Sequence, residues 1–401
     1  MPFTKTICHL SFPTMVLHKV LFLPFLLSWA ATASTARRCT NHAAKNGIYV
    51  EGPVDVIDDP LANFDAPKLA TYNRTAVEDW SHDAVSEDGS MGLAFTYSRG
   101  SVGPAVAAQR VFLSVVWPNG TRYMEFAFAE ESNFEMCPDK TTGRFFNRTS
   151  EFEWKMESTS DFKHSVTMIN SPTVKGTVTM KALVPPLYPN GLQYPDPKGD
   201  PFFAPLLWWE ENVPTGTVEA NLTINGTPLI FRGVGGRERN WNSLAWSDVC
   251  ESWDMVRGVV GPYSFIGWKN KSKIEGTQFS LVLLKGNRVV FRTQSLIPSA
   301  SAPFASIEQM DNGPLHLASP PSANVQLPES RFSGYAIHMV SPESNKEWRF
   351  NVNFTQTVYW FKASATAHIG GFVGNVKGGE VGKRQYAGLG SGNTQESVDK
   401  P

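Results

Sequence analysis

Apolar and polar residues alternate with a period of two along most of the chain. In residues 173–182, Val174 and Val178 fall on one side, while lysines and threonines fall on the other. Residues 218–224 and 348–360 alternate in the same way. No long segment repeats its apolar residues about every 3.6 positions, as an amphipathic helix does. The pattern therefore predicts an all-β fold of antiparallel strands, arranged in barrels or sandwiches.

Turn residues separate these alternating segments. Three dipeptides typical of tight hairpins lie between apolar runs: Asn119-Gly120, Asn225-Gly226 and Gly286-Asn287. At 401 residues, the chain is long enough for two domains of ordinary size. We predict one antiparallel β domain over residues 37–229 and a second over residues 230–388. Residues 389–401 are rich in glycine, serine and charge, which predicts a disordered tail.

The first 36 residues have the composition of a secretory signal peptide. Lys5, His18 and Lys19 form a basic start, residues 20–27 are apolar, and small residues follow up to position 36. The apolar run is shorter than the roughly 20 residues that span a bilayer. We therefore expect a soluble protein that is lumenal or secreted, with no membrane partner once the leader is cleaved. An uncleaved anchor is the alternative.

Asn-x-Ser/Thr acceptor sites agree with a secretory route. A glycan is bulky and hydrated, so an occupied asparagine must point outward. Two of the acceptors, Asn221 and Asn353, fall on the polar side of an alternating segment. The predicted glycosylation sites are Asn73, Asn119, Asn147, Asn221, Asn225, Asn270 and Asn353.

The cysteines allow at most one disulfide within the mature chain. Cys8 leaves with the leader, so three cysteines remain. Pairing of Cys39 with Cys137 is favoured because Cys250 lies in an apolar, strand-like segment, where a buried free thiol is common. The sequence alone does not settle the pairing.

Charge and motifs narrow the classes of function. The net charge is −1 and charged residues make up 18%, which argues against a nucleic-acid partner. The chain has no His-Glu-x-x-His, Cys-x-x-Cys, phosphate-binding, Gly-x-Ser-x-Gly or dinucleotide motif, and its histidines are scattered. We therefore expect neither a metal nor an organic cofactor. With 12 tryptophans, the chain has enough large aromatic residues to line a binding site as well as a core.

The segment that follows residue 232 concentrates charged and aromatic residues. A glycine-rich loop is predicted at residues 233–242. In the strand that follows, alternation places three large side chains on one face: Trp253, Met255 and Arg257. A cation among apolar groups needs a partner. Arg257 is therefore expected either in a structural ion pair, with Glu238 or Asp83, or as a donor directed into a ligand cavity.

Four segments, in this order, resemble the fungal lipocalin-like Diels–Alderases, relatives of the carotenoid hydratase-like two-domain calycins. They are Trp80-Ser-His-Asp83, Gly233-x-Gly-Gly-Arg-Glu-Arg-Asn-Trp241, Trp253-x-Met-x-Arg257-Gly-x-x-Gly-Pro-Tyr263 and Gly370-Gly-Phe-x-Gly374-x-x-x-Gly-Gly-Glu380. In the glycine loop, Arg237 and Glu238 replace a His-Asp pair of the family pattern, and Asn242 replaces its last glycine. With the leader and the acceptor sites, this departure favours similarity to the secreted hetero-Diels–Alderases of tropolone sesquiterpenoid pathways.

The resemblance implies a cofactor-independent pericyclase of secondary metabolism, with a lipocalin-like barrel and a cavity between or within its domains. Its partners would be small apolar substrates, a tropolone-derived quinone methide and a sesquiterpene alkene such as humulene. The catalytic candidates are Arg257, Tyr263, Asp83 and Glu238. The candidates for substrate binding are Trp80, Trp241, Trp253, Met255, Trp268, Trp348, Tyr359 and Trp360.

Three other functions remain open at this point. The first is an intramolecular, decalin-forming Diels–Alderase. The second is a lipocalin-like carrier that binds an apolar metabolite without turnover. The third is a secreted carbohydrate-active β-sandwich, which would place an exposed tryptophan platform beside a pair of carboxylates. The sequence gives no indication of the oligomeric state.

Overall fold

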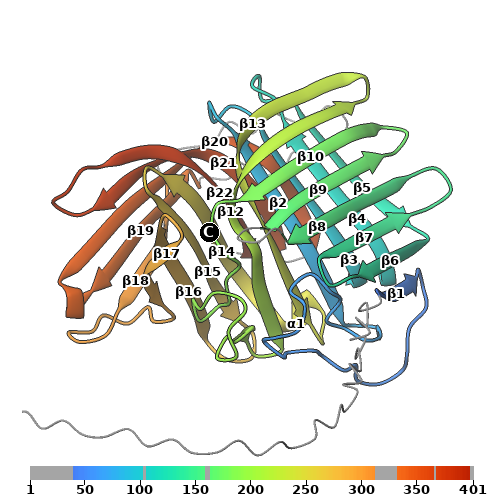
Figure 1. The fold of residues 1–401 in the computed structure, drawn as a ribbon, viewed down its shortest axis with the longest axis horizontal. Coiled ribbons are helices and arrows are strands. Elements are labelled where there is room, and N and C mark those ends of the chain that lie inside the picture. Colours follow the sequence, from blue (N-terminus) through green and yellow to red (C-terminus); the bar gives the residue numbers. More distant parts are fainter. Residues whose placement is uncertain (1–38, 103–104, 159–162, 312–331, 365–366, 398–401) are drawn as a thin grey trace, which may run out of the picture. The chain divides into compact units, whose positions relative to one another are not determined.

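The computed structural model describes residues 39–102, 105–158, 163–311, 332–364 and 367–397. Nearly all regular structure in these ranges is β-strand, and the strands form two antiparallel sheets, an N-terminal and a C-terminal one (Figure 1). The predicted all-β class is therefore confirmed. The predicted signal peptide, residues 1–36, lies outside the described residues. Among the described helices, none is both long and apolar enough to cross a membrane.

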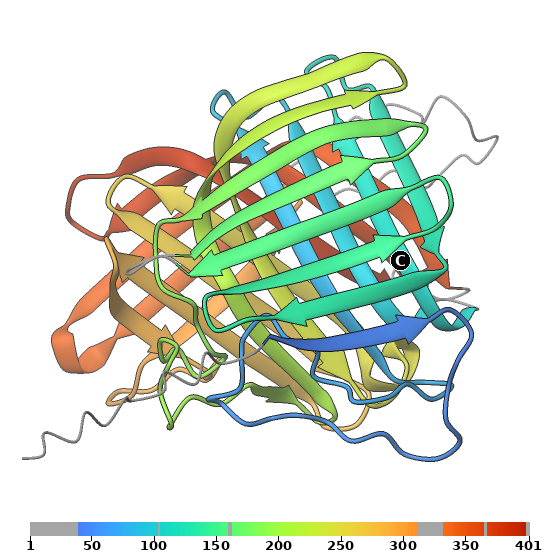
Figure 2. The same ribbon diagram turned by 45° about the vertical axis from the view of Figure 1, so that its right-hand side comes forward.

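The N-terminal sheet curls around its own apolar core (Figure 2). The core includes Trp80, Tyr97, Phe134 and Trp154. In spatial order, the strands are β1 (Thr40–Lys45), β6 (Glu131–Met136), β7 (Lys140–Phe146), β8 (Glu151–Ser158), β9 (Lys163–Asn170), β10 (Val174–Ala182), β12 (Leu207–Ile224), β13 (Thr227–Asn242), β2 (Val77–Ser86), β3 (Gly92–Val102), β4 (Ala105–Val116) and β5 (Arg122–Ala129), with the short β11 (Phe202–Ala204) beside β12.

The C-terminal sheet encloses a second core of aromatic and branched residues, among them Phe265, Tyr335, Trp348 and Phe372. Helix α1 (Trp246–Val249) lies in the chain between the two sheets, and the 3-10 turn η1 (Pro342–Ser344) joins β19 to β20. In spatial order, the strands are β17 (Arg288–Thr293), β16 (Thr277–Lys285), β15 (Tyr263–Ser272), β14 (Cys250–Val260), β22 (Tyr386–Ser397), β21 (Ala367–Glu380), β20 (Lys346–Ser364), β19 (Gly334–Ser341) and β18 (Phe304–Met310).

Two predicted boundaries are wrong. Strand β13 continues to Asn242 and pairs with β12 and β2, so the chain leaves the N-terminal sheet after residue 242 rather than 229. The predicted disordered tail is β22, which lies between β14 and β21 as far as residue 397. Its glycines serve close packing, since a Cβ at Gly388 would lie 2.0 Å from the carbonyl oxygen of Val259. Residues 398–401 lie outside the described part.

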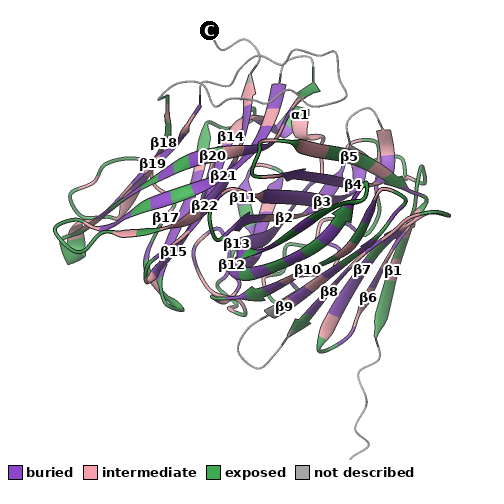
Figure 3. Cartoon of the chain, turned by 90° about the horizontal axis from the view of Figure 1, so that it is seen from above, coloured by how far each residue is buried: buried purple, intermediate pink, exposed green. Residues whose placement is uncertain are grey.

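Burial alternates along the strands (Figure 3) and separates the glycan acceptors into three groups. Asn73 and Asn147 are half-buried. Asn270 on β15 is fully buried, and its Oδ1 accepts a hydrogen bond from the Cys250 thiol at 2.9 Å. The folded chain has no room for a glycan at Asn270, so that predicted site is wrong. The exposed acceptors are Asn119, Asn221, Asn225 and Asn353.

The structure joins Cys39 to Cys137, the pairing that the sequence favours, and leaves Cys250 as a buried free thiol. The bond ties the chain just before β1 to the end of β6, its partner strand. Among the described residues, one grouping of three potential metal ligands lies within 4.8 Å, and it consists of Glu135 and these two bonded cysteines.

Replacing both Cys39 and Cys137 by serine is expected to lower the free energy of unfolding by about 2–4 kcal/mol. The disulfide closes a loop of 98 residues, so its removal frees the unfolded chain. Urea unfolding followed by tryptophan fluorescence measures the change. Reductant should lower the midpoint of the native protein and leave the double variant unaffected. Equal midpoints for the native protein and the variant would contradict a stabilising role.

Candidate functional site

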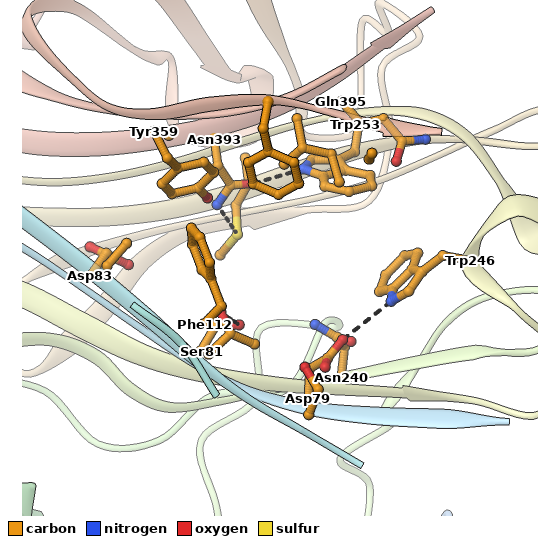
Figure 4. Close-up of a pocket in the computed structure, with 18 of the residues that line it drawn as sticks. Asp79, Ser81, Asp83, Phe112, Asn240, Trp246, Trp253, Tyr359, Asn393 and Gln395 are labelled. Atoms are coloured by element: carbon orange, nitrogen blue, oxygen red, sulfur yellow. Dashed lines mark hydrogen bonds between the residues drawn. The ribbon is translucent and has the colours of Figure 1, made fainter. Parts of the chain in front are cut away.

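A cavity of about 1010 Å³ lies between the two sheets. One wall comes from β13, β2, β3, β4 and β5, and the other from β14, β15, β22, β21 and β20, and α1 also lines the cavity. Figure 4 shows the two walls facing one another across the cavity. Of the two predicted placements, between or within the domains, the structure therefore shows the first.

The N-terminal wall changes from polar to aromatic across the sheet. Cross-strand pairing aligns one row of five cavity-lining residues: Glu238 on β13, Ser81 on β2, Thr96 on β3, Phe112 on β4 and Phe126 on β5. Strand alternation turns most neighbours of these residues, such as Trp80 beside Ser81, to the opposite face. The polar half of the wall thus comes from β13, β2 and β3, and the aromatic half from β4 and β5.

The C-terminal wall combines aromatic side chains with amides. Asn393 on β22 is paired with Met255 on β14, and its Oδ1 accepts a hydrogen bond from Trp253 Nε1 at 2.7 Å. Tyr359 on β20 reaches towards the other wall, where its ring lies 5.1 Å from that of Phe112, edge to face. An apolar ligand in the cavity is therefore bounded by aromatic rings on both sides.

Arg257 links the two sheets. From β14, its Nε donates to Asp83 Oδ2 on β2 at 3.2 Å, and its Nη1 donates to Glu211 Oε2 on β12 at 2.8 Å. Nη1 also donates to the carbonyls of Val213 and Pro214. Burial acts to lower the pKa of Arg257, but the carboxylates of Asp83 and Glu211 outweigh it and raise this pKa. Arg257 is therefore a permanent cation in a structural ion pair.

A glycine makes room for this cation. A Cβ at Gly236 on β13 would lie 1.9 Å from Arg257 Nη1. The glycine-rich segment is thus required by the approach of β14, and it is part of a strand rather than the predicted loop. Of the two predicted carboxylate partners, Asp83 binds Arg257, whereas Glu238 bonds elsewhere.

Glu238 is a buried carboxyl group on the cavity wall. Its Oε2 accepts a hydrogen bond from Trp209 Nε1 at 2.8 Å. Burial raises the pKa of Glu238 to about 7, against the opposing effects of Arg257 and Trp209. A carboxyl group with this pKa exchanges a proton near neutral pH, which suits general acid catalysis.

The cavity brings together seven of the twelve candidate residues. The remaining five point into the domain cores. Trp80 and Trp241 flank the Arg239 guanidinium inside the N-terminal domain, at 4.8 and 4.9 Å from its central carbon. The candidates that line the cavity are Arg257, Asp83, Glu238, Trp253, Met255, Trp268 and Tyr359.

Tyr263, Trp348 and Trp360 belong to the core of the C-terminal sheet and do not line the cavity. Alternation explains Trp360, because its neighbour Tyr359 takes the cavity side of β20. These three and the two N-terminal tryptophans, predicted as site residues, therefore lie outside the cavity.

Several residues that line the cavity were not predicted from the sequence. Asp79 and Ser81 lie on either side of Trp80, so alternation places them on the other face of that strand. This polar face could have identified them as cavity residues. Asn393 and Gln395 lie in the segment taken for a tail. No sequence signal identifies the others, because they meet only through strand pairing. The missed residues include Asp79, Ser81, Asn240, Trp246, Phe112, Phe126, Phe361, Asn393 and Gln395.

Comparison with known proteins gives consistent matches. Residues 36–397 match the model of the family described as Diels-Alderase-like. The chain is 28% identical to the Diels-Alderase cheD of Chaetomium globosum, over 92% of this chain and 85% of that one. It is 30% identical to the Diels-Alderase poxQ of Penicillium oxalicum, over 80% and 70% respectively. The crystal structure of CghA with Sch210972 shares the fold, with a TM-score of 0.73 at 21% identity over 90% of this chain and all of that one.

Proposed function

The chain belongs to the Diels-Alderase-like family and is a Diels–Alder pericyclase, and from this premise we propose that it catalyses a hetero-Diels–Alder reaction. The diene is a tropolone-derived quinone methide, and the alkene is a sesquiterpene such as humulene. One observation carries the proposal: a protonatable carboxyl group, Glu238, faces a large aromatic cavity between the sheets.

Confinement supplies most of the catalysis. Well-oriented reactants can gain up to about 7–11 kcal/mol over free encounter. The cavity, at about 1010 Å³, lies at the upper end of the roughly 300–1,000 Å³ usual for ligand sites. It can therefore hold two apolar reactants together between the rings of Phe112, Tyr359 and Trp253.

Glu238 assists formation of the diene. In a hydroxymethyl tropolone, the bond between the methylene carbon and its hydroxyl oxygen breaks. Glu238 donates the proton with which that hydroxyl leaves as water, and the ring hydroxyl loses its own proton to solvent. The product is a neutral quinone methide with adjacent C=C and C=O bonds.

The cycloaddition then forms two bonds. The methylene carbon of the quinone methide bonds to one alkene carbon, and its carbonyl oxygen bonds to the other. The two new bonds close a six-membered ring. A donor on that oxygen makes the diene more reactive. Tyr359 fits this role, because burial raises the pKa of its phenol and keeps the O–H intact. Arg257 lines the same cavity as the second candidate donor.

The disulfide and the exposed acceptors Asn119, Asn221, Asn225 and Asn353 support a location in the secretory pathway. The protein therefore acts, in this proposal, in the lumen or outside the cell.

Purified protein, incubated with a hydroxymethyl tropolone and humulene, is expected to give one stereoisomer of the adduct faster than buffer alone. Chiral chromatography with mass spectrometry measures the product ratio. Equal rates and ratios with and without protein would contradict the proposal. Conversion of a linear polyene precursor instead would favour the intramolecular reaction, and binding without turnover would favour a carrier.

A further inference from the structure

A row of polar side chains crosses the N-terminal wall beside the row that contains Glu238. Antiparallel pairing aligns four residues on neighbouring strands: Asn240 on β13, Asp79 on β2, Ser98 on β3 and Arg110 on β4. All four line the cavity, and we call them the polar row. Figure 4 shows Asp79 and Asn240 together, with the ring nitrogen of Trp246 directed at Asp79.

The polar row has hydrogen-bonding capacity that the protein does not use. Asp79 is 9% exposed, and its Oδ2 accepts from Trp246 Nε1 at 3.2 Å. Among the residues that the structure describes, Asp79 Oδ1, Asn240 Oδ1 and Arg110 Nε have no hydrogen-bond partner, and the Ser98 hydroxyl on the paired strand is the neighbouring donor that acts on the Asp79 carboxyl. Buried polar atoms are nearly always hydrogen-bonded in native proteins. Unused acceptors beside an unused donor, on a cavity wall, therefore indicate a polar ligand group.

The charges in the polar row indicate which group fits. Burial raises the pKa of the Asp79 carboxyl, against opposing effects of Ser98, Arg110 and Trp246. The Arg110 guanidinium lies 5.2 Å from the ring centre of Phe126, so it contacts both the polar and the aromatic halves of the wall. The row therefore offers a carboxyl group, which can accept a hydrogen bond, and a guanidinium, which can donate one. It suits a neutral ligand group that both donates and accepts hydrogen bonds.

We propose that the polar row binds a substrate group in which a hydroxyl lies beside a carbonyl oxygen. The hydroxyl donates to Asp79, and the carbonyl accepts from Arg110. This inference rests on the proposed function, whose tropolone reactant carries such a pair. Glu238 is two residues from Asn240 on β13, or roughly 7 Å along the strand. A ring held by the row would thus place a substituent near the acid.

Binding in the polar row also sets the orientation of the substrate. The hydroxyl–carbonyl edge then runs from Asp79 on β2 to Arg110 on β4, so the apolar part lies against the neighbouring row, beside Phe112 on β4 and Phe126 on β5. The row therefore determines which face of the diene meets the alkene, and its loss should change stereoselectivity.

This assignment is tested by measuring the affinities of tropolone and tropone by calorimetry. Tropone lacks the hydroxyl, and a weakly acidic buffer keeps tropolone protonated. Native protein should prefer tropolone by roughly ten- to hundredfold, the range of one hydrogen bond to a charged group. Asp79→Leu should abolish the preference by weakening tropolone alone. Arg110→Met should weaken both ligands, because both carry the carbonyl.

Asp79→Asn is the conservative variant if Asp79→Leu fails to fold, and it should reduce the preference without abolishing it. Glu87→Gln, an exposed carboxylate-to-amide change after β2, is the matched control and should bind as the native protein does. Equal affinity of native protein for both ligands, or an unchanged preference in folded Asp79→Leu and Asp79→Asn, would overturn the assignment.

The cycloaddition assay, run in parallel, separates this inference from the proposed function. If native protein prefers tropolone but shows no rate enhancement, the proposed function fails and the polar row stands. If native protein catalyses the reaction and the Asp79 variants keep its stereoselectivity and its ligand preference, the polar row fails alone.

Discussion

Arg257→Met is expected to lower the free energy of unfolding by about 3–5 kcal/mol, the loss found when one partner of a buried ion pair is removed. Glu211 is 1% exposed, and Arg257 is its ion-pair partner among the described residues, so the variant would leave its buried carboxylate without that cation. Burial already raises the pKa of Glu211 well above its usual value, although Arg257 acts to lower it. Without Arg257, this carboxyl group must take up a proton or draw in water.

The loss should extend beyond local stability, because Arg257 joins the two sheets that form the cavity walls. Its bonds run from β14 to Asp83 on β2 and to Glu211 on β12. Removing it should loosen the cavity, so we expect turnover to fall together with stability.

Urea unfolding, with activity measured in parallel, tests this expectation. Lys271→Met is the matched control, because Lys271 forms an exposed ion pair with Glu251 at 2.6 Å on the same sheet. Such surface pairs contribute about 0–1 kcal/mol. Adding Glu211→Met to Arg257→Met should recover part of the stability, since paired apolar residues replace buried ion pairs well. Equal stability of Arg257→Met and Lys271→Met would refute the bridging role.

The period-two pattern is sufficient to predict the strands and one cavity face. Trp253, Met255 and Arg257 were placed together by alternation alone, and all three line the cavity. The same rule separates Trp80 from Asp83, because residues at odd separation face opposite sides of a strand. Trp80 was predicted to line the cavity because it is a large aromatic residue. Alternation along the strand already places it on the opposite face from Asp83.

The rest of the site depends on pairing between distant strands, which composition does not reveal. Asn393 reaches the cavity because β22 inserts between β14 and β21. Its segment resembles a flexible tail, yet a Cβ at Gly392 would lie 2.7 Å from the ring of Phe354. Glycine is needed there for tight packing against a core ring, and a glycine-rich composition alone does not distinguish that need from disorder.

Glu238→Gln is expected to slow reaction from the hydroxymethyl precursor by roughly 10²–10⁴-fold, the usual contribution of a general acid. The amide keeps the size of the side chain and can still accept the Trp209 hydrogen bond, but it cannot donate an acidic proton. If the quinone methide is generated chemically in the assay, Glu238→Gln should cyclise it nearly as fast as native protein does. Dehydration, not cycloaddition, is the step that needs the acid.

The same role for Glu238 predicts how activity changes with pH. Burial raises the pKa of Glu238 to about 7, so the acid form predominates below that pH and is lost above it. Native activity from the precursor should therefore fall as pH rises through about 7, and Glu238→Gln should lack that fall. Glu308→Gln, an exposed carboxylate on β18, should keep the native profile. If Glu238→Gln retained both the native rate and the native profile, another group would have to supply the proton, because no amide side chain titrates in this range.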